Sequence, residues 1–362
     1  MQYRDLGKTG LRVSAIGLGC VQLGSSETEY AVRVVRRALE LGVTYIDAAR
    51  GYRDAEIKVG RALEGHRDKV VLSTKTGATI RDTAWREVHE SLKRLRTDYL
   101  DNCHLHCLGP GRDIERRLGR GGALEALIQA KEQGLIRHIG CTSHHTETLI
   151  EAIHRFDFEV VLLIMNVVER APLDRLIPLC QERGIGVTVM KPLATGLLPA
   201  RLALKWLLNQ PIACAVPGAA TVQEVEENAM VGHGDLTLTV AEQMRVQALQ
   251  EELAHVRCRM CEACLPCPEN IPISEILGSD DVYNHYRTMG PDAFRAFRWS
   301  RRAIAQDLPE RKRRIQVIEG CTRCGICEDR CPYGLPIMEM LQGVLPAMKD
   351  MLRIYGELPA TR

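Results

Sequence analysis

The sequence is poor in aromatic residues and carries no excess of charge of either sign. Phe, Trp and Tyr make up 4% of the 362 residues, and the formal net charge is +2 at pH 7. Proteins that bind single-stranded nucleic acid stack bases on aromatic side chains, and nucleic-acid binding in general needs a basic surface. We therefore expect no nucleic-acid partner.

Long hydrophobic runs are also missing. No stretch approaches the roughly 18 uninterrupted apolar residues of a membrane-spanning helix. The first ten residues, MQYRDLGKTG, are charged where a secretion signal has an apolar run. We expect a protein without a membrane partner, located in the cytoplasm.

Cysteine, by contrast, is abundant and unevenly placed. Six of the 14 cysteines are scattered before residue 258, and eight lie between Cys258 and Cys331. In a reducing compartment such a dense group indicates a metal site rather than a disulfide framework. At about 150 residues per domain, the length of the chain indicates about two domains. Because the dense cysteine group begins at Cys258, we predict that the domains are residues 1–256 and residues 257–362.

The first domain alternates short apolar segments with longer helical patterns. Near-continuous apolar runs predict strands buried on both faces, and the intervening helices predict parallel pairing. The predicted strands are residues 13–20, 43–49, 70–76, 99–106, 136–143, 160–166, 185–192 and 214–219. Eight such units indicate a closed (β/α)8 TIM barrel of the α/β class. Two Rossmann-like halves are the alternative.

Four pairs of residues have the spacing of helix-capping boxes, which predicts where helices of this domain begin. The pairs are Ser26 with Glu29, Thr148 with Glu151, Thr221 with Glu224 and Thr239 with Glu242.

Ionisable residues follow or end several predicted strands, where a barrel places its active site. Asp47, Lys75 and His106 lie at three successive strand ends, and Tyr52 follows Asp47 by five residues. An ammonium beside a phenol favours the phenolate, and a carboxylate keeps the ammonium charged. A nearby imidazole can polarise a carbonyl. The set predicts an acid for the reduction of a carbonyl group.

Residues 1 to about 230 resemble the aldo-keto reductase family. The motifs that carry the resemblance are LGKTGLRVSAIGLG, YIDAARGY followed by Glu56 and Gly60, STKTG, TDYLDNCHLH, IRHIGCTS, VMKPL and VPGAATVQEVEEN. The resemblance implies that Asp47, Tyr52, Lys75 and His106 form the catalytic tetrad, with Tyr52 as general acid or base. It implies reversible hydride transfer between NAD(P)H and an aldehyde or ketone, or the corresponding alcohol.

The same resemblance implies a set of cofactor contacts. They are Gly19, Cys20, Asp47, Ser143, His144, Asn166, Met190, Lys191, Pro192, Leu193, Gly218, Glu227 and Asn228. Relatives that prefer NADPH bind its 2′-phosphate with basic side chains after the eighth strand, where this chain has Gly218, Ala219 and Glu224. A carboxylate repels a phosphate and can accept a hydrogen bond from a ribose hydroxyl. We therefore expect a preference for NADH, although Glu224 also fits a capping role.

The substrate side is less specified. Cys107 stands where many relatives have Trp, and the loop that follows contains four arginines, Arg112, Arg116, Arg117 and Arg120. This loop is interpreted as either solvated or in contact with an anionic substrate.

The late cysteines form two runs, each followed by proline. The first is Cys258, Cys261, Cys264 and Cys267, and the second is Cys321, Cys324, Cys327 and Cys331. The second run has the bacterial ferredoxin spacing, and four thiolates in each run suit a 4Fe-4S cluster. We predict two such clusters in a small, mostly helical ferredoxin-like domain, with tetrahedral zinc as the competing metal.

Resemblance to two-cluster ferredoxins implies that the fourth cysteine of each run binds the other cluster. Cys331 then joins the first run, and Cys267 joins the second.

Nicotinamide transfers two electrons as a hydride, whereas a 4Fe-4S cluster transfers one, so direct electron exchange between the two is chemically awkward. The clusters therefore have either a structural or redox-sensing role or a role in electron transfer. Basic clusters at Arg298, Arg301 and Arg302 and at residues 311–314 suit an acidic redox carrier or a solvated helix face. The alternative function is an electron-transfer or redox-sensing protein whose barrel turns over slowly.

Overall fold

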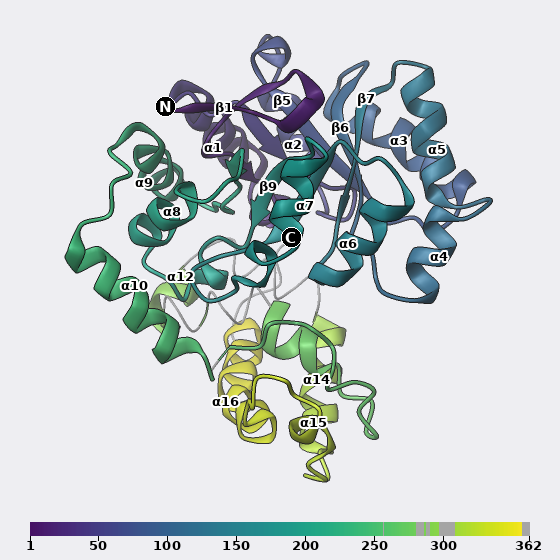
Figure 1. The fold of residues 1–362 in the computed structure, drawn as a ribbon. Helices are drawn as coiled ribbons and strands as arrows, with labels where there is room; N and C mark the ends of the chain where they lie inside the picture. The colour runs from purple at the N-terminus through teal and green to yellow at the C-terminus, as the bar shows by residue number, and fades with distance from the viewer. Residues whose placement is uncertain (256, 280–285, 287–289, 297–307, 357–362) are drawn as a thin grey trace. The chain divides into compact units, whose positions relative to one another are not determined.

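A curled parallel sheet forms the centre of the N-terminal part of the computed structural model, which describes residues 1–255, 257–279, 286, 290–296 and 308–356 (Figure 1). Its strands follow the order β10-β9-β8-β7-β6-β5-β4-β3. Their bounds are β3 Leu18–Gly19, β4 Tyr45–Asp47, β5 Val71–Thr76, β6 Leu100–Leu105, β7 Ile136–Thr142, β8 Val160–Ile164, β9 Gly186–Met190 and β10 Cys214–Ala215. Each of the eight predicted strand regions contributes a strand to this sheet, so the barrel prediction is confirmed.

The first and last strands of this sheet meet and close it. Parallel bridges join Ile16 to Ala215 and Gly19 to Gly218. The Gly19 amide donates to the carbonyl of Pro217 at 2.9 Å. A Cβ on Gly19 would lie 3.2 Å from Gly218 Cα, so the close approach at this seam favours glycine.

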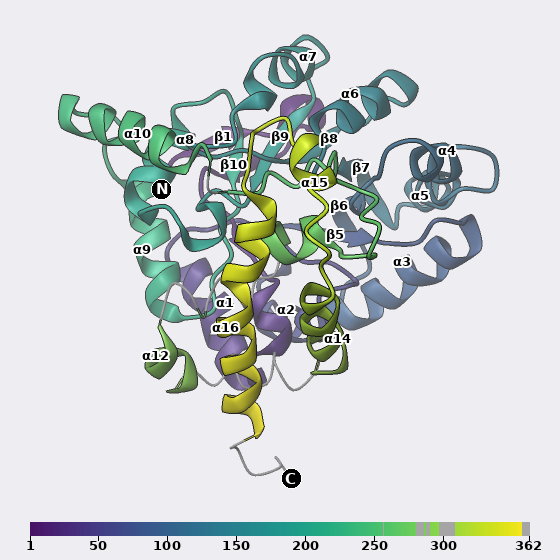
Figure 2. The same cartoon turned by 90° about the horizontal axis from the view of Figure 1, so that it is seen from below.

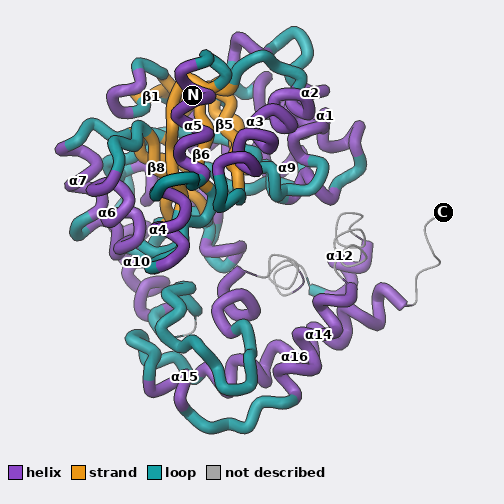
Figure 3. Tube along the Cα trace, turned by 90° about the vertical axis from the view of Figure 1, so that its right-hand side faces the viewer, coloured by secondary structure: helices purple, strands orange, loops and turns teal. Residues whose placement is uncertain are grey.

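Helices surround the strands of this barrel (Figures 2 and 3). They bury their apolar faces on the sheet, as the parallel pairing requires. Their bounds are α1 Thr28–Glu40, α2 Ala55–Ala62, α3 Arg81–Leu95, α4 Arg112–Leu118, α5 Ala123–Glu132, α6 Thr146–Arg155, α7 Leu176–Glu182, α8 Ala200–Leu208 and α9 Val222–His233. Single 3-10 turns occur at Gly7–Thr9, Gln22–Ser25, Arg67–Lys69, Ala171–Leu173 and Ala194–Gly196.

The predicted strand over residues 13–20 is wrong as a single element. Its first part, β2 (Arg12–Ser14), pairs antiparallel with β1 (Tyr3–Asp5), and only β3 belongs to the barrel. Between them a Cβ on Gly17 would come within 2.9 Å of Cys214 Sγ. The chain changes partner at this tight approach, which depends on a residue about 200 positions away in sequence.

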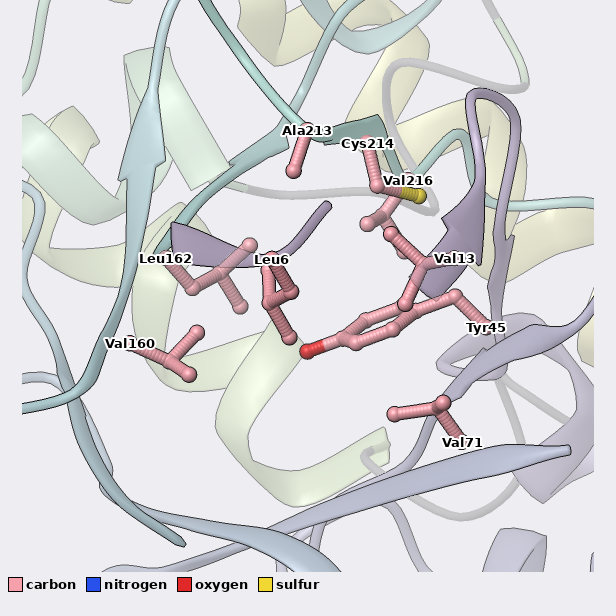
Figure 4. Close-up of a cluster of buried hydrophobic side chains, with 9 residues drawn as sticks. All are labelled: Leu6, Val13, Tyr45, Val71, Val160, Leu162, Ala213, Cys214 and Val216. Carbon is pink, nitrogen blue, oxygen red and sulfur yellow. The ribbon is translucent and has the colours of Figure 1, made fainter. Parts of the chain in front are cut away.

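The β1–β2 hairpin covers the amino-terminal ends of the barrel strands. Gly7 has a φ of +55°, and a Cβ there would lie 2.3 Å from the amide of Gly186, the first residue of β9. Figure 4 shows side chains of the hairpin and several strands gathered around the ring of Tyr45. This apolar plug fills one end of the barrel and leaves its carboxyl end for chemistry.

Two of the four predicted capping boxes are confirmed. Thr221 and Glu224 cap α9 reciprocally, and Thr239 and Glu242 do the same before α10. The other two predictions are wrong. Helix α1 is capped by the Glu27 side chain, and α6 begins at Thr146, before the predicted box. The side chain that caps a helix therefore need not be the serine or threonine with which the predicted motif begins.

The chain separates into two compact units. One comprises Met1–Leu193 and Pro199–Gln243, and the other comprises Ala194–Leu198 and the chain from Met244 onward. The described helices of the second unit are most of α10 Val240–Leu253, the π-helical turn Glu275–Ser279, α12 Pro291–Ala296, α14 Leu308–Glu319, α15 Ile326–Asp329 and α16 Ile337–Gly356. Most of α10 falls in this unit, and the predicted division of the chain after residue 256 stays a prediction.

The described part of the second unit consists of helices and loops (Figure 3). None of the described helices of the chain is both long and apolar enough to cross a membrane.

Candidate active site and cysteine cluster

The four predicted catalytic side chains lie at the carboxyl ends of neighbouring strands. Asp47 ends β4, Lys75 is the fifth residue of β5, and His106 directly follows β6. Tyr52 lies in the loop between β4 and α2. Because these strands are adjacent and parallel, the structure brings all four side chains together.

A buried ion pair organises the four groups. Lys75 Nζ lies 2.6 Å from Asp47 Oδ2 and also donates to the carbonyl oxygen of Ala48 at 2.6 Å. Its third contact is the Tyr52 hydroxyl oxygen at 3.4 Å. Lys75 is 1% exposed and Asp47 4%, so little solvent screens this pair. The ammonium is fixed between a carboxylate and the phenol.

The phenol of Tyr52 is a neutral acid at neutral pH. Burial raises the pKa of Tyr52 to about 12, while the Lys75 charge acts in the opposite direction. We expected Lys75 to favour the phenolate, and it does, but burial of the phenol outweighs it. Burial also lowers the pKa of Lys75, but the charge and hydrogen bond of Asp47, together with the neighbouring tyrosines, outweigh this effect and raise the pKa. Tyr52 thus keeps its proton, and Lys75 keeps its charge.

His106 lies against the phenol as a neutral imidazole. The rings of Tyr52 and His106 are 5.7 Å apart between centroids and nearly perpendicular. Burial and the Lys75 and Arg117 charges lower the pKa of His106 to about 3. A neutral imidazole can donate a hydrogen bond to a carbonyl oxygen without adding charge to the site.

The arginine-rich loop is a helix with one buried arginine. Arg117 in α4 is 9% exposed, and its guanidinium binds Asp113 Oδ1 at 2.9 Å and the His106 carbonyl at 2.8 Å. It thereby positions the strand end that carries His106. The other three arginines, Arg112, Arg116 and Arg120, are exposed.

The predicted nicotinamide contacts surround the same end of the barrel, and several are held by local hydrogen bonds. Ser143 Oγ donates to the Leu108 carbonyl at 2.7 Å. Asn166 Nδ2 donates to the Lys191 carbonyl at 3.1 Å, which ties the end of β8 to the end of β9. Burial and the Lys191 charge lower the pKa of His144 to about 3.

The residues predicted to meet the cofactor after β9 form a turn. Met190 ends the strand and is half-buried, and Lys191 has a φ of 53°. Pro192 is buried and Leu193 half-buried. Left-handed backbone at a non-glycine residue is uncommon and occurs often at functional turns.

The barrel seam offers a polar atom that suits a bound cofactor. Gly19, Cys20 and Gly218 lie at this seam, and a Cβ on Gly218 would lie 2.5 Å from Gln22 Oε1. This buried amide oxygen accepts no hydrogen bond from the described residues. A ribose hydroxyl or an amide N–H would satisfy it, so the seam fits the nicotinamide nucleotide implied by the motifs.

Beyond the seam, α9 presents acidic and amide groups. Glu224 Oε2 accepts from the amides of Ala220 at 2.6 Å and Thr221 at 2.9 Å, so its carboxylate is engaged in capping. Glu227 is exposed and accepts from the Gln223 side chain, and Asn228 is buried.

In the second unit, one small hollow is lined by four thiols. They come from both runs and are Cys267, Cys321, Cys324 and Cys327. This is the set that the exchange of fourth cysteines implies. Cys264 lies close enough to Cys258 and Cys261 for their charges to add to the burial that raises its pKa.

The donor set is four thiolates in each run, which zinc and a 4Fe-4S cluster both accept. Four sulfurs around a hollow suit the wider cube of a 4Fe-4S cluster.

A hollow that no sequence pattern marks lies beside the tetrad. It has a volume of about 550 Å³ and is lined by Arg50, Gly51, Arg53, Asp54, Gly77, Glu87, Arg94 and His106. No motif assigned a role to Arg50, Arg53 or Arg94. Arg50 lies inside the YIDAARGY segment, two residues before Tyr52, and Arg53 directly follows Tyr52.

Half of the predicted carrier-binding patch is described. Arg311 is buried, and Arg313 and Arg314 are paired with Glu310 at 2.8 and 3.1 Å. Arg298, Arg301 and Arg302 lie outside the described residues. Docking of an acidic redox carrier stays a prediction.

Comparison with known proteins identifies both parts. Residues 15–201 match the model of the aldo/keto reductase family, and residues 257–336 match a 4Fe-4S dicluster domain. An uncharacterized oxidoreductase of Bacillus subtilis, YqkF, is 32% identical over 213 residues, covering 55% of this chain and 67% of that protein. L-glyceraldehyde 3-phosphate reductase of Escherichia coli O157:H7 is 29% identical over 231 residues, covering 56% of this chain and 64% of that protein.

Solved structures show the same likeness. The holo form of an aldo-keto reductase from Bacillus halodurans superposes with a TM-score of 0.61 at 29% identity, covering 69% of this chain and 96% of that one. A Klebsiella pneumoniae aldo/keto reductase in complex with NADP and acetate gives 0.59 at 28% identity, covering 67% and 94%. The chain belongs to the aldo/keto reductase family and carries a C-terminal 4Fe-4S dicluster domain.

Proposed function

We propose that the barrel interconverts an aldehyde or ketone and its alcohol with a nicotinamide cofactor, and that Tyr52 is the general acid or base. The observation that carries this proposal is the buried Lys75 ammonium, which joins Asp47 at 2.6 Å to the Tyr52 hydroxyl at 3.4 Å. The neutral His106 beside the phenol completes a site that can polarise and protonate a carbonyl oxygen.

The chain's own residues handle the proton. Reduced nicotinamide, when bound, supplies the hydride that forms the new C–H bond at the carbonyl carbon. As the C=O π bond breaks, its electron pair takes the proton of the Tyr52 hydroxyl, which leaves a phenolate. Lys75 stabilises this phenolate, and Asp47 holds Lys75 in place. His106 donates a hydrogen bond to the carbonyl oxygen of the substrate and orients this oxygen. Solvent then returns a proton to Tyr52.

The cofactor assignment rests on the seam and on the ends of β7, β8 and β9. We assign the nicotinamide amide to Ser143 and Asn166, its ring to Met190, and the adenosine part to Gly218, Glu227 and Asn228. The remaining residues of the predicted cofactor-binding site are Gly19, Cys20, His144, Lys191, Pro192 and Leu193. We propose a preference for NADH because Glu224 places a carboxylate at the start of α9. A Klebsiella pneumoniae relative is known in complex with NADP, so this preference is a departure to be tested.

We propose two 4Fe-4S clusters with exchanged fourth ligands. Cys258, Cys261, Cys264 and Cys331 would hold one, and Cys267, Cys321, Cys324 and Cys327 the other. The hollow lined by the second set supports this exchange. Such clusters transfer single electrons, and we give them a structural or electron-transfer role without a step in carbonyl reduction. None of the 14 cysteines, all of which are described, forms a disulfide, which suits the proposed location in a reducing cytoplasm.

A panel of aldehydes and ketones tests the proposal. The purified, anaerobic protein should oxidise NADH or NADPH only with a carbonyl substrate present, and Tyr52→Phe should lower kcat about 100-fold or more, as the loss of a general acid does. If Tyr52→Phe leaves carbonyl reduction intact, the tetrad assignment is wrong. If no carbonyl compound is reduced but the clusters exchange electrons with NADH, the alternative of an electron-transfer protein replaces it.

A further inference from the structure

We propose that the substrate is a small aldehyde or ketone that also carries an anionic group, a carboxylate or a phosphate, and that Arg50 binds this group in the hollow beside the tetrad. The inference rests on the proposed carbonyl reduction and names the class of substrate for the same site. It depends on the position, hydrogen bonding and charge of Arg50.

The hollow adjoins the predicted reaction centre. His106 is both a tetrad member and one of its lining residues, and Gly51 and Arg53 are the chain neighbours of Tyr52. Its volume of about 550 Å³ is large enough for a small metabolite. A substrate whose carbonyl group lies at His106 can therefore extend into this hollow toward the arginines.

Arg50 is fixed at its backbone but loosely held at its guanidinium. Its amide donates to the carbonyl of Lys75 at 3.0 Å, which anchors it to the strand that carries the catalytic lysine. Its guanidinium lies 3.6 Å from Glu56 and 3.9 Å from Glu90, both longer than a hydrogen bond. Among the described residues, the side chain of Arg50 donates no hydrogen bond. Five N–H donors in a rigid fork thus remain for water or a ligand.

A structural arginine of the same barrel looks different. Arg67, which is 17% exposed at its side chain against 26% for Arg50, binds Asp101 Oδ2 at 2.8 Å and the Tyr99 carbonyl at 2.9 Å. Its donors are used by the fold. A half-buried arginine without such bonds, facing a hollow, has the properties of a binding residue.

The carboxylates near Arg50 are either shared with another arginine or exposed to solvent. Glu56 is fully buried, and its carboxylate serves both Arg50 at 3.6 Å and Arg94 at 3.3 Å. Glu90 and Asp54 are 44% and 57% exposed at their side chains, so water screens them.

Glu87 is one of two carboxylates in the lining, and it accepts a hydrogen bond from Thr76. The lining has three guanidinium groups against the carboxylates of Asp54 and Glu87. An anion from a substrate would supply Arg50 with the close partner that the chain does not provide. Arg–carboxylate and Arg–phosphate pairs are commonly bidentate, which would also orient the carbonyl.

Matched pairs of substrates test the proposal with the cluster-loaded protein. Glyceraldehyde 3-phosphate is compared with glyceraldehyde, and succinic semialdehyde with butanal. We expect the wild type to prefer the anionic member of at least one pair, and the larger preference identifies phosphate or carboxylate as the bound group. Arg50→Gln should lower kcat/KM for that anionic substrate about 10- to 100-fold, chiefly through KM, since hydrogen bonds to charged groups contribute that much.

The controls separate binding from folding. Arg50→Lys should recover part of the loss, and Arg86→Gln, an exposed arginine of α3 outside the hollow, should change neither pair. The melting temperature and iron content of each variant check that it folds. Calorimetric titration with succinate and inorganic phosphate gives a readout without turnover, and binding should be lost in Arg50→Gln.

The outcomes are distinct. Equal use of anionic and neutral substrates, with no binding of succinate or phosphate, overturns the anion site but leaves carbonyl reduction intact. Anion binding that depends on Arg50, without any carbonyl reduction, overturns the proposed function and retains the site. A loss in Arg50→Gln that is equal for neutral and anionic substrates assigns Arg50 to the fold and contradicts the proposal.

Discussion

Replacement of Lys75 by methionine should slow turnover by a factor that follows from the distances in the tetrad. At an effective dielectric constant of about 20, a Tyr52 phenolate 3.4 Å from the ammonium gains roughly 5 kcal/mol. Because both oxygens contact the same ammonium nitrogen, the Asp47 carboxylate lies no more than about 6 Å from the phenol oxygen and opposes this by roughly 3 kcal/mol on the same basis. The ion pair as a whole therefore stabilises the phenolate by roughly 2 kcal/mol.

Lys75→Met removes both contributions. Burial raises the pKa of Asp47 and the Lys75 charge lowers it, so removal of the ammonium raises this pKa further and weakens the repulsion between Asp47 and the phenolate. The loss of about 2 kcal/mol corresponds to a factor of roughly 30. Because a variant cannot alter the overall equilibrium, kcat/KM for carbonyl reduction and for alcohol oxidation should fall by the same factor.

Initial rates of nicotinamide absorbance change in both directions measure this effect. Breaking a buried ion pair costs about 3–5 kcal/mol of stability, so the melting temperature is recorded beside the rates. The double variant Asp47→Asn, Lys75→Met removes the unpaired carboxyl and should show the same loss of rate. Lys205→Met is the matched control, since Lys205 is also buried and lies 2.6 Å from Glu242. Rates of Lys75→Met within threefold of wild type in both directions would refute the assigned role.

Three further predictions concern protons, clusters and cofactor choice. The pKa of Tyr52 is raised to about 12, so the phenol stays protonated. The rate of carbonyl reduction should therefore be constant from about pH 7 to about pH 10, while the rate of alcohol oxidation rises about tenfold per pH unit. An alcohol-oxidation rate that reaches a plateau with a midpoint near neutrality would contradict this. Anaerobic protein should hold about eight irons per chain, and Cys267→Ala, Cys321→Ala and the double variant should each retain about four, as two ligands of one cluster require; loss of both clusters in the double variant, or zinc in place of iron, would contradict the ligand assignment. Glu224→Gln should raise kcat/KM for NADPH relative to NADH about threefold, the effect of one partly exposed charge; an unchanged ratio would assign Glu224 to helix capping alone.

Sequence patterns predicted the elements whose signal is local or repeated. The eight barrel strands are marked by apolar runs, and the tetrad residues follow from their places at strand ends and in family motifs. The capping of α9 by Thr221 and Glu224 was also predictable, because both partners lie within one turn of helix. In each case the physical cause lies within a few residues of the effect.

Features that depend on distant contacts were not predicted. The break between β2 and β3 follows from the approach of Gly17 to Cys214, and the burial of Arg117 follows from its bond to the His106 carbonyl. The weak pairing of Arg50 likewise depends on where α3 places Glu90. The pKa of Tyr52 was expected to be lowered, because the sequence showed the lysine but not how deeply the phenol is buried.

The central claim is that the barrel transfers a hydride directly to a carbonyl carbon and that the clusters stay outside this step. Nicotinamide deuterated at its transferable position, mixed anaerobically with the protein and an aldehyde that it reduces, tests this in one experiment. We expect one deuterium at the former carbonyl carbon for each nicotinamide oxidised, with the visible absorbance of the clusters unchanged during turnover. Product without deuterium, formed while the clusters bleach and recover, would contradict the account.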